Sequence, residues 1–170
     1  MKILSLCGSL RSNSTNGYLL KAAKSCRPND LWVDFNLADL PYFDPDNQYS
    51  VQTPQVVLEF RNLGATVDAI FIATPEYAHG LPGILKNALE WLFHEGTMSK
   101  PVFVVIGTAQ GDHTRDQLIE IIKTMDFKIN PSQVLLLKGV RSKIDTAGAF
   151  SDSNTRTVFE DFCKQIGALK

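Results

Sequence analysis

Short apolar runs alternate with helical segments along the whole chain, and this alternation most constrains the fold. The apolar runs have the length and composition of buried strands, and the segments between them repeat apolar residues three or four positions apart. The predicted strands are Ile3–Cys7, Trp32–Phe35, Ala69–Ala73, Val102–Gly107 and Val134–Leu137. The predicted helices are Thr15–Cys26, Pro54–Gly64, Gly83–His94, Thr114–Met125 and Asn154–Gly167. Such alternation predicts an α/β protein with a doubly wound parallel sheet and helices on both faces.

Length and charge narrow the class of protein. The 170 residues fit a single domain, residues 1–170, with a full core. A net charge of −1 and the absence of a lysine or arginine cluster longer than a pair argue against a nucleic-acid partner. No apolar stretch reaches the roughly 18 residues needed to span a bilayer. We therefore expect no membrane association and a cytoplasmic location.

The cysteines and histidines do not indicate a metal site or a disulfide framework. The three cysteines are odd in number, far apart and without a C-x-x-C spacing: Cys7, Cys26 and Cys163. Cys7 ends an apolar strand and Cys163 lies on the apolar face of a helix, so both are expected to be small buried residues. His79, His94 and His113 show no metal-ligand spacing with one another or with a cysteine. No bound metal is predicted.

The segment after the first strand has the features of an anion site. Residues 8–16 read Gly-Ser-Leu-Arg-Ser-Asn-Ser-Thr-Asn and lead directly into a helix. A helix N-terminus presents unpaired N–H groups and a favourable dipole to an anion. Ser9, Ser14 and Thr15 add hydroxyl donors, and Arg11 adds a forked cation suited to phosphate oxygens. Because neither the dinucleotide motif nor the ATP-binding motif is present, a mononucleotide phosphate is the expected anion.

The segment after the third strand is the second informative stretch. Pro75 stiffens the exit from that strand, while Gly80, Pro82 and Gly83 force a tight path into the next helix. Between them, residues 76–78 offer main-chain polar groups and an aromatic ring to a flat heteroaromatic ligand. In doubly wound sheets the ligand lies beyond the carboxyl ends of the strands. The segments after strands one, three and four are therefore expected to share one crevice.

Together these two segments resemble the NADPH-dependent FMN reductase family of flavodoxin-like proteins, which includes quinone, azo-dye and chromate reductases. The family's G-S-x-R-x-x-S-x-N loop matches Gly8, Ser9, Arg11, Ser14 and Asn16. Its P-E-Y-N…P-G-x-L-K-N-A-[ILM]-[DE]-W segment matches Pro75, Glu76, Tyr77, Pro82, Gly83, Leu85, Lys86, Asn87, Ala88, Leu89, Glu90 and Trp91. The order of elements agrees over nearly the whole chain.

The resemblance implies strand order 2-1-3-4-5 and an enzyme that passes electrons from NADPH or NADH through bound FMN. Small-molecule acceptors would be quinones, azo compounds, metal oxyanions or flavins. The cofactor-binding residues implied are Ser9, Arg11, Ser14, Thr15, Asn16, Pro75, Glu76, Tyr77, Ala78, Thr108 and Gly111. No catalytic side chain is expected, because the flavin itself carries out hydride transfer. The implied assembly is a homodimer or a dimer of dimers, and the helix 83–94 is expected at the contact because it is apolar round more than one face.

Two departures and one alternative stay open. Ala78 replaces the family's asparagine, so one amide contact near the ring is missing. The segment 108–113 lacks the Gly-Gly and Ser often found after the fourth strand. A flavodoxin-type electron carrier would bind the same FMN without NAD(P)H activity of its own. Trp91 is expected in the core or at a subunit contact.

Overall fold

The computed structural model describes residues 1–168 and contains one five-stranded sheet. All neighbouring strands are parallel and the order is β2-β1-β3-β4-β5, as predicted. The strands are β1 (Lys2–Cys7), β2 (Leu31–Phe35), β3 (Ala69–Thr74), β4 (Val102–Thr108) and β5 (Val134–Lys138). The central strand β3 is buried at every position, whereas the edge strand β2 is exposed at Leu31 and Asp34 and half-buried at its other positions. The flavodoxin-like fold class is thereby confirmed.

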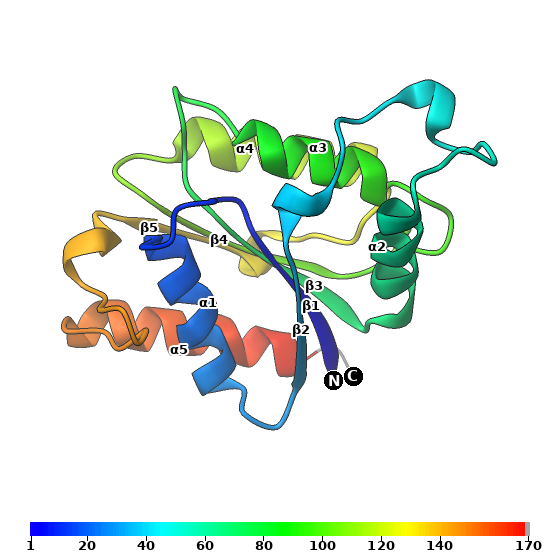
Figure 1. Cartoon of the computed structure of the whole chain (residues 1–170). Helices are drawn as coiled ribbons and strands as arrows, with labels where there is room; N and C mark the ends of the chain where they lie inside the picture. Colours follow the sequence, from blue (N-terminus) through cyan, green and yellow to red (C-terminus); the bar gives the residue numbers. More distant parts are fainter. Residues whose placement is uncertain (169–170) are drawn as a thin grey trace.

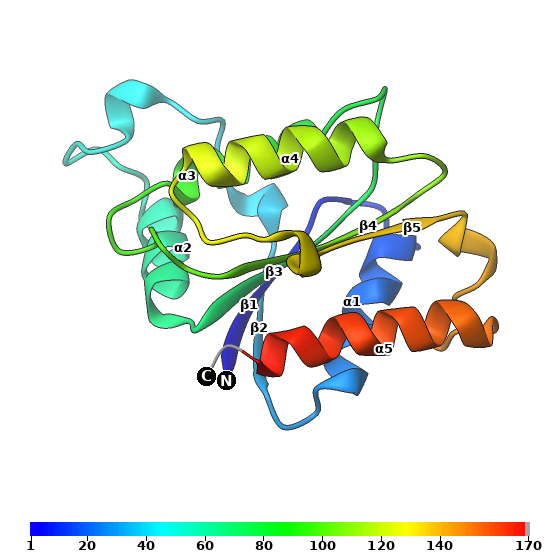
Figure 2. The same cartoon turned by 180° about the vertical axis from the view of Figure 1, so that it is seen from behind.

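Five helices cover the two faces of the sheet (Figures 1 and 2). They are α1 (Thr15–Cys26), α2 (Gln55–Thr66), α3 (Gly83–Leu92), α4 (Asp112–Thr124) and α5 (Ser153–Gly167). Helices α2, α3 and α4 lie on one face and α1 and α5 on the other, so the sheet separates two hydrophobic clusters. Within residues 1–168 no helix is both long enough and apolar enough to cross a lipid bilayer.

Strand alternation explains the two clusters. Leu4 and Leu6 of β1 belong to the cluster beneath α2 and α3, whereas Ile3 belongs to the cluster with α1 and α5. Successive side chains of a strand point to opposite faces, so a fully apolar strand supplies both layers of the core. The short 3₁₀ segments lie in the connections: Leu37–Asp39, Pro45–Asn47, Pro131–Gln133 and Val140–Ser142.

Several helix boundaries differ from those that the sequence predicts, and the glycine at position 64 explains one of them. Helix α2 continues past Gly64 to Thr66, and Gly64 is a buried packing residue. A Cβ at this position would lie 2.7 Å from Leu92 Cδ1, so glycine lets α2 approach α3 closely. Helix α3 ends at Leu92 rather than at His94, while α4 begins at Asp112, two residues before the predicted start.

Trp91 belongs to the core, and the apolar character of α3 is used within the subunit. The Trp91 side chain is fully buried, and its Nε1 donates to the carbonyl of Pro41 at 2.9 Å. Buried Arg61 donates to the carbonyl of Trp91 at 2.8 Å and to that of Gln48 at 2.7 Å. Helix α3 therefore packs against the sheet, α2 and the segment 41–53. Trp91 therefore contributes no exposed surface to a subunit contact, and the contact predicted at α3 stays a prediction.

Candidate functional site

The carboxyl ends of β1, β3 and β4 converge on one pocket of about 300 Å³. The segments that follow these strands lie together at one edge of the sheet (Figure 1). The pocket is lined by Ser9, Arg11, Asn13, Ser14, Thr15, Asn16, Pro75, Tyr77, Gly107, Thr108, Ala109, Gly139 and Arg141. A larger cavity of about 470 Å³ lies between α1 and α5, away from these strand ends. The smaller pocket is the candidate site because its lining matches the predicted chemistry.

The first wall of the pocket is the N-terminus of α1. Ser14 is the N-cap residue, and its hydroxyl accepts a hydrogen bond from the Gly17 N–H at 3.3 Å. The first turn contains no acidic residue, so no local carboxylate opposes the positive end of the helix dipole. Gly8 lets the end of β1 pass close to the end of β3, because a Cβ on it would lie 2.4 Å from Thr74 Oγ1. Thr15 and Asn16, the first two residues of α1, line the pocket, so the N-terminus of the helix borders it.

Asn16 joins this wall to the end of β4. Its Nδ2 donates to the Gly107 carbonyl at 3.0 Å, and its Oδ1 accepts from the Gly107 N–H at 3.1 Å. The pairing of β3 with β4 ends at Thr74 and Ile106, so Asn16 satisfies the next main-chain groups of β4. The amide is buried and its two hydrogen bonds go to protein. Asn16 lines the pocket as predicted, and its side chain holds the pocket's walls together.

Glu76 also connects two walls. Its carboxylate accepts from the main-chain N–H groups of Gly111 and Thr114, both at 3.3 Å, and from the Thr114 hydroxyl at 3.2 Å. These contacts place a negative charge at the N-terminus of α4, where the helix dipole favours it. The Glu76 side chain is only 8% exposed and does not line the pocket.

Residues 77–80 form a tight turn at the rim. The N–H and C=O groups of Tyr77 and Gly80 bond to each other at 3.0 Å in both directions. The two central residues, Ala78 and His79, both have positive φ angles of +50° and +58°. Asparagine and glycine adopt such angles at lower cost than other residues. The family's asparagine at position 78 therefore also suits the backbone of this turn.

Tyr77 forms the exposed edge of the pocket. Its ring is 48% exposed, and its hydroxyl lies 3.1 Å from the Ser9 hydroxyl. This hydrogen bond connects the segment after β3 with the segment after β1. His79 and His113 stand nearby with their ring centroids 5.6 Å apart, and both are exposed. His79 Nδ1 also lies 3.8 Å from Glu76 Oε1.

Two exposed arginines face the pocket, one of which the sequence analysis missed. Arg11 comes from the predicted loop, whereas Arg141 lies in the connection after β5, where no motif drew attention to it. Asn13, Gly107, Ala109 and Gly139 are further lining residues that were not predicted. Of the predicted site residues, Glu76, Ala78 and Gly111 are outside the lining. An adjoining shallow pocket of about 370 Å³ shares Arg11 and Tyr77 and has apolar walls of Leu10, Pro82 and Ile84.

The donor set fits a phosphate ester attached to an aromatic group. The N-terminus of α1, several hydroxyls and two guanidinium groups line the same pocket as Pro75 and Tyr77, which supply flat surfaces. Among residues 1–168, no group of three or more histidine, cysteine or acidic side chains is placed to hold a metal ion. The donor set of the pocket suits the phosphate of a mononucleotide.

The match to a protein-family model decides between the two candidate classes, a reductase and a flavodoxin-type electron carrier. The family model for NADPH-dependent FMN reductases matches residues 1–140, which include every wall of the pocket except Arg141. The chain belongs to the NADPH-dependent FMN reductase family. FMN and NAD(P)H are accordingly its cofactors, and it is an oxidoreductase. The electron-carrier alternative, which lacks NAD(P)H activity, does not fit this family.

The similarity to individual relatives extends over almost the whole chain. A 2-hydroxy-1,4-benzoquinone reductase from Burkholderia sp. is 31% identical, with 99% of this chain and 95% of the relative covered. A quinone reductase from Escherichia coli K12 is 26% identical, covering 98% and 97%. Among solved structures, the NAD(P)H:(acceptor) oxidoreductase FerB from Paracoccus denitrificans superposes with a TM-score of 0.84. It is 20% identical, with 96% of this chain and 93% of FerB covered. This last likeness supports the fold of the family member described here.

Proposed function

We propose that this chain is a single FMN-binding domain that transfers electrons from NAD(P)H to quinone-like small molecules at the β1–β3–β4 pocket. Azo compounds, metal oxyanions and free flavins are the other small molecules proposed to accept electrons from the reduced flavin. The observation that carries the proposal is the composition of the pocket lining. It combines an anion-binding helix N-terminus and two arginines with no aspartate, glutamate, histidine, lysine or cysteine.

The phosphate of FMN is assigned to the N-terminus of α1. Ser9, Ser14, Thr15 and the N–H groups of the first turn supply neutral donors, and Arg11 supplies a charged one. Arg141 brings a second positive charge to the same pocket from the other side. Asn16 is assigned a positioning role, because both ends of its amide are engaged by Gly107.

The ring of FMN is assigned to the side of the pocket formed by Pro75, Tyr77 and Thr108. When bound, FMN supplies two-electron redox chemistry, and the protein supplies orientation and electrostatics. Without a general acid or base in the lining, the chain acts by holding reactants in alignment and excluding water. The adjoining pocket with Leu10, Pro82 and Ile84 offers an apolar surface to a second flat molecule, either nicotinamide or acceptor. Glu76, Ala78 and Gly111 act by shaping the rim.

The experiment is a titration with FMN and with riboflavin, which lacks the phosphate. Replacing Arg11 with alanine should weaken FMN binding on the order of 10- to 100-fold, since a charge-assisted hydrogen bond contributes about 1.5–3 kcal/mol. Riboflavin binding should stay unchanged. Arg156→Ala is the matched control, because Arg156 is an exposed arginine on α5 that pairs with Glu160. Equal losses for FMN and riboflavin in Arg11→Ala would contradict the assigned phosphate position.

We also propose a cytoplasmic homodimer. The cytoplasmic location follows from the need for NAD(P)H. The dimer is supported by the segment 41–53, which projects beyond the helices in Figure 1 and exposes Tyr42, Tyr49 and Val51. Exposed apolar side chains that gather on one segment mark protein contacts more often than scattered ones do. Sedimentation should give twice the chain mass, and Tyr42→Ser with Val51→Ser should shift it toward the monomer. A wild-type monomer at every concentration would rule out the dimer.

A further inference from the structure

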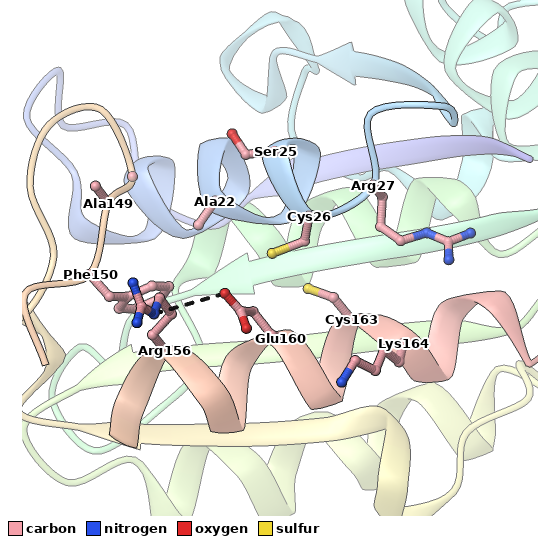
Figure 3. Close-up of a pocket in the computed structure, with 11 residues that line it drawn as sticks. Ala22, Ser25, Cys26, Arg27, Ala149, Phe150, Arg156, Glu160, Cys163 and Lys164 are labelled. Atoms are coloured by element: carbon pink, nitrogen blue, oxygen red, sulfur yellow. Dashed lines mark ion pairs between the residues drawn. The ribbon is translucent and has the colours of Figure 1, made fainter. Parts of the chain in front are cut away.

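Two cysteines that are distant in the sequence meet on the face of the molecule formed by α1 and α5. Cys26 is the last residue of α1 and Cys163 lies in α5. Both line the cavity of about 470 Å³, and Figure 3 shows their side chains extending from α1 and α5 into the space between the two helices. The sequence gives no hint of this pair, because no C-x-x-C spacing joins the two residues. The fold alone brings them together.

The two thiols are not equivalent. Cys26 is exposed, whereas Cys163 is 1% exposed. A hydrogen bond from the Cys163 thiol lowers the pKa of Cys26, although burial and the Glu160 carboxylate oppose this effect. The same hydrogen bond and burial raise the pKa of Cys163, with a smaller opposing effect from Arg27. Both shifts favour loss of a proton from the exposed Cys26 sulfur before the buried Cys163 sulfur, and the thiolate is the reactive form of a cysteine.

We propose that Cys26 and Cys163 form a redox-active dithiol site that hydrogen peroxide oxidises to a disulfide. The Cys26 sulfur attacks a peroxide oxygen, so an S–O bond forms, the O–O bond breaks, and hydroxide leaves and is protonated to water. Cys26 is then a sulfenic acid. The Cys163 sulfur attacks the Cys26 sulfur, an S–S bond forms, and a second water leaves with the proton of Cys163. Two electrons have passed from the thiols to the peroxide.

The surrounding cavity gives a small oxidant a path to the two cysteines. It is open between α1, residues 148–150 and α5, and Arg27, Arg156 and Lys164 line it together with Glu160 (Figure 3). Arg156 Nε lies 4.0 Å from Glu160 Oε1, so this carboxylate is partly neutralised beside the thiols. The site lies at the last residue of α1, whereas the flavin pocket lies at the first turn of the same helix. Oxidation is therefore expected to leave FMN affinity unchanged.

The test is mass spectrometry of the full-length, reduced protein after treatment with a few equivalents of hydrogen peroxide. The intact mass should fall by two hydrogen atoms, and peptide mapping should show Cys26 joined to Cys163. Cys7→Ser is the matched control and should give the same product. Cys26→Ser should leave Cys163 reduced, and Cys163→Ala should leave a sulfenic acid at Cys26 that dimedone captures. Melting curves and FMN binding confirm that each variant is folded.

The disulfide would also change stability in a measurable way. It would tie α1 to α5 and close most of the chain into one loop, so the melting temperature should rise by roughly 5–15 °C. Dithiothreitol should reverse the rise. The proposal is overturned if Cys26 is converted only to sulfinic or sulfonic acid, if Cys7 enters the crosslink, or if no thiol is oxidised. These readouts are independent of FMN reduction.

Discussion

The two hydrogen bonds between Asn16 and Gly107 allow a sharp test of what this residue does. Replacing Asn16 with alanine would leave a buried N–H and a buried C=O of β4 without partners. Each unsatisfied group costs about 1–3 kcal/mol, so the free energy of unfolding should fall by roughly 2–5 kcal/mol. This is a large share of a typical stability of about 5–15 kcal/mol. The loss should occur in the protein without FMN.

The assay is urea unfolding of the FMN-free protein, followed by circular dichroism. Asn16→Asp keeps the acceptor for the Gly107 N–H but sets a carboxylate against the Gly107 carbonyl, so it should be destabilising as well. Ser12→Ala is the control, because Ser12 is an exposed residue of the same loop. If Asn16→Ala unfolded at the wild-type urea concentration and lost only FMN affinity, Asn16 would be a ligand contact and the positioning role would be refuted.

Three further predictions concern stability. Ala78→Asn should stabilise the protein by about 0.5–1 kcal/mol in urea unfolding, because its φ of +50° suits asparagine; a loss of stability would contradict this explanation. Gly64→Ala should destabilise by about 1 kcal/mol or more despite the better helix propensity of alanine, since the added Cβ would crowd buried Leu92; a gain would show that α2 and α3 adjust freely. Burial raises the pKa of Asp30, but hydrogen bonds and ion pairs with Arg27 and the N-terminal amine outweigh it, so the pKa of this carboxyl is lowered. The stabilisation that these ion pairs give the folded state is therefore complete above the unfolded pKa of about 3.9. It is lost as pH falls through the lower folded value. Asp30→Asn should therefore unfold more easily at neutral pH and converge on wild type in acid melts, whereas a constant difference would disprove this linkage.

The sequence predicted the sheet and its helices because apolar periodicity is a local signal that the core requires. Gly64 misled the prediction of α2, since a glycine that ends a helix and one that permits close packing look alike without the partner Leu92. The sequence leaves Trp91 between the core and a subunit contact, because it does not show that Arg61 and the segment 41–53 lie against this residue.

The candidate site was predicted in its location but not in all its roles. Motif spacing placed Ser9, Arg11 and Asn16 at the pocket, yet it cannot distinguish a ligand contact from a side chain that fastens two walls. The Glu76 carboxylate is a similar case, because its partners on α4 become visible only in three dimensions. Arg141 had no motif around it, and only the geometry of the connection after β5 brings it to the pocket.

The most direct test of the central claim is anaerobic mixing of the FMN-loaded protein with NADPH and then with a benzoquinone. The account predicts that the visible absorbance of the bound flavin disappears on adding NADPH or NADH and returns on adding the quinone. Arg11→Ala, reloaded with excess FMN, should follow the same course with weaker cofactor retention. A bound flavin that dithionite reduces but neither NADPH nor NADH reduces would contradict the account.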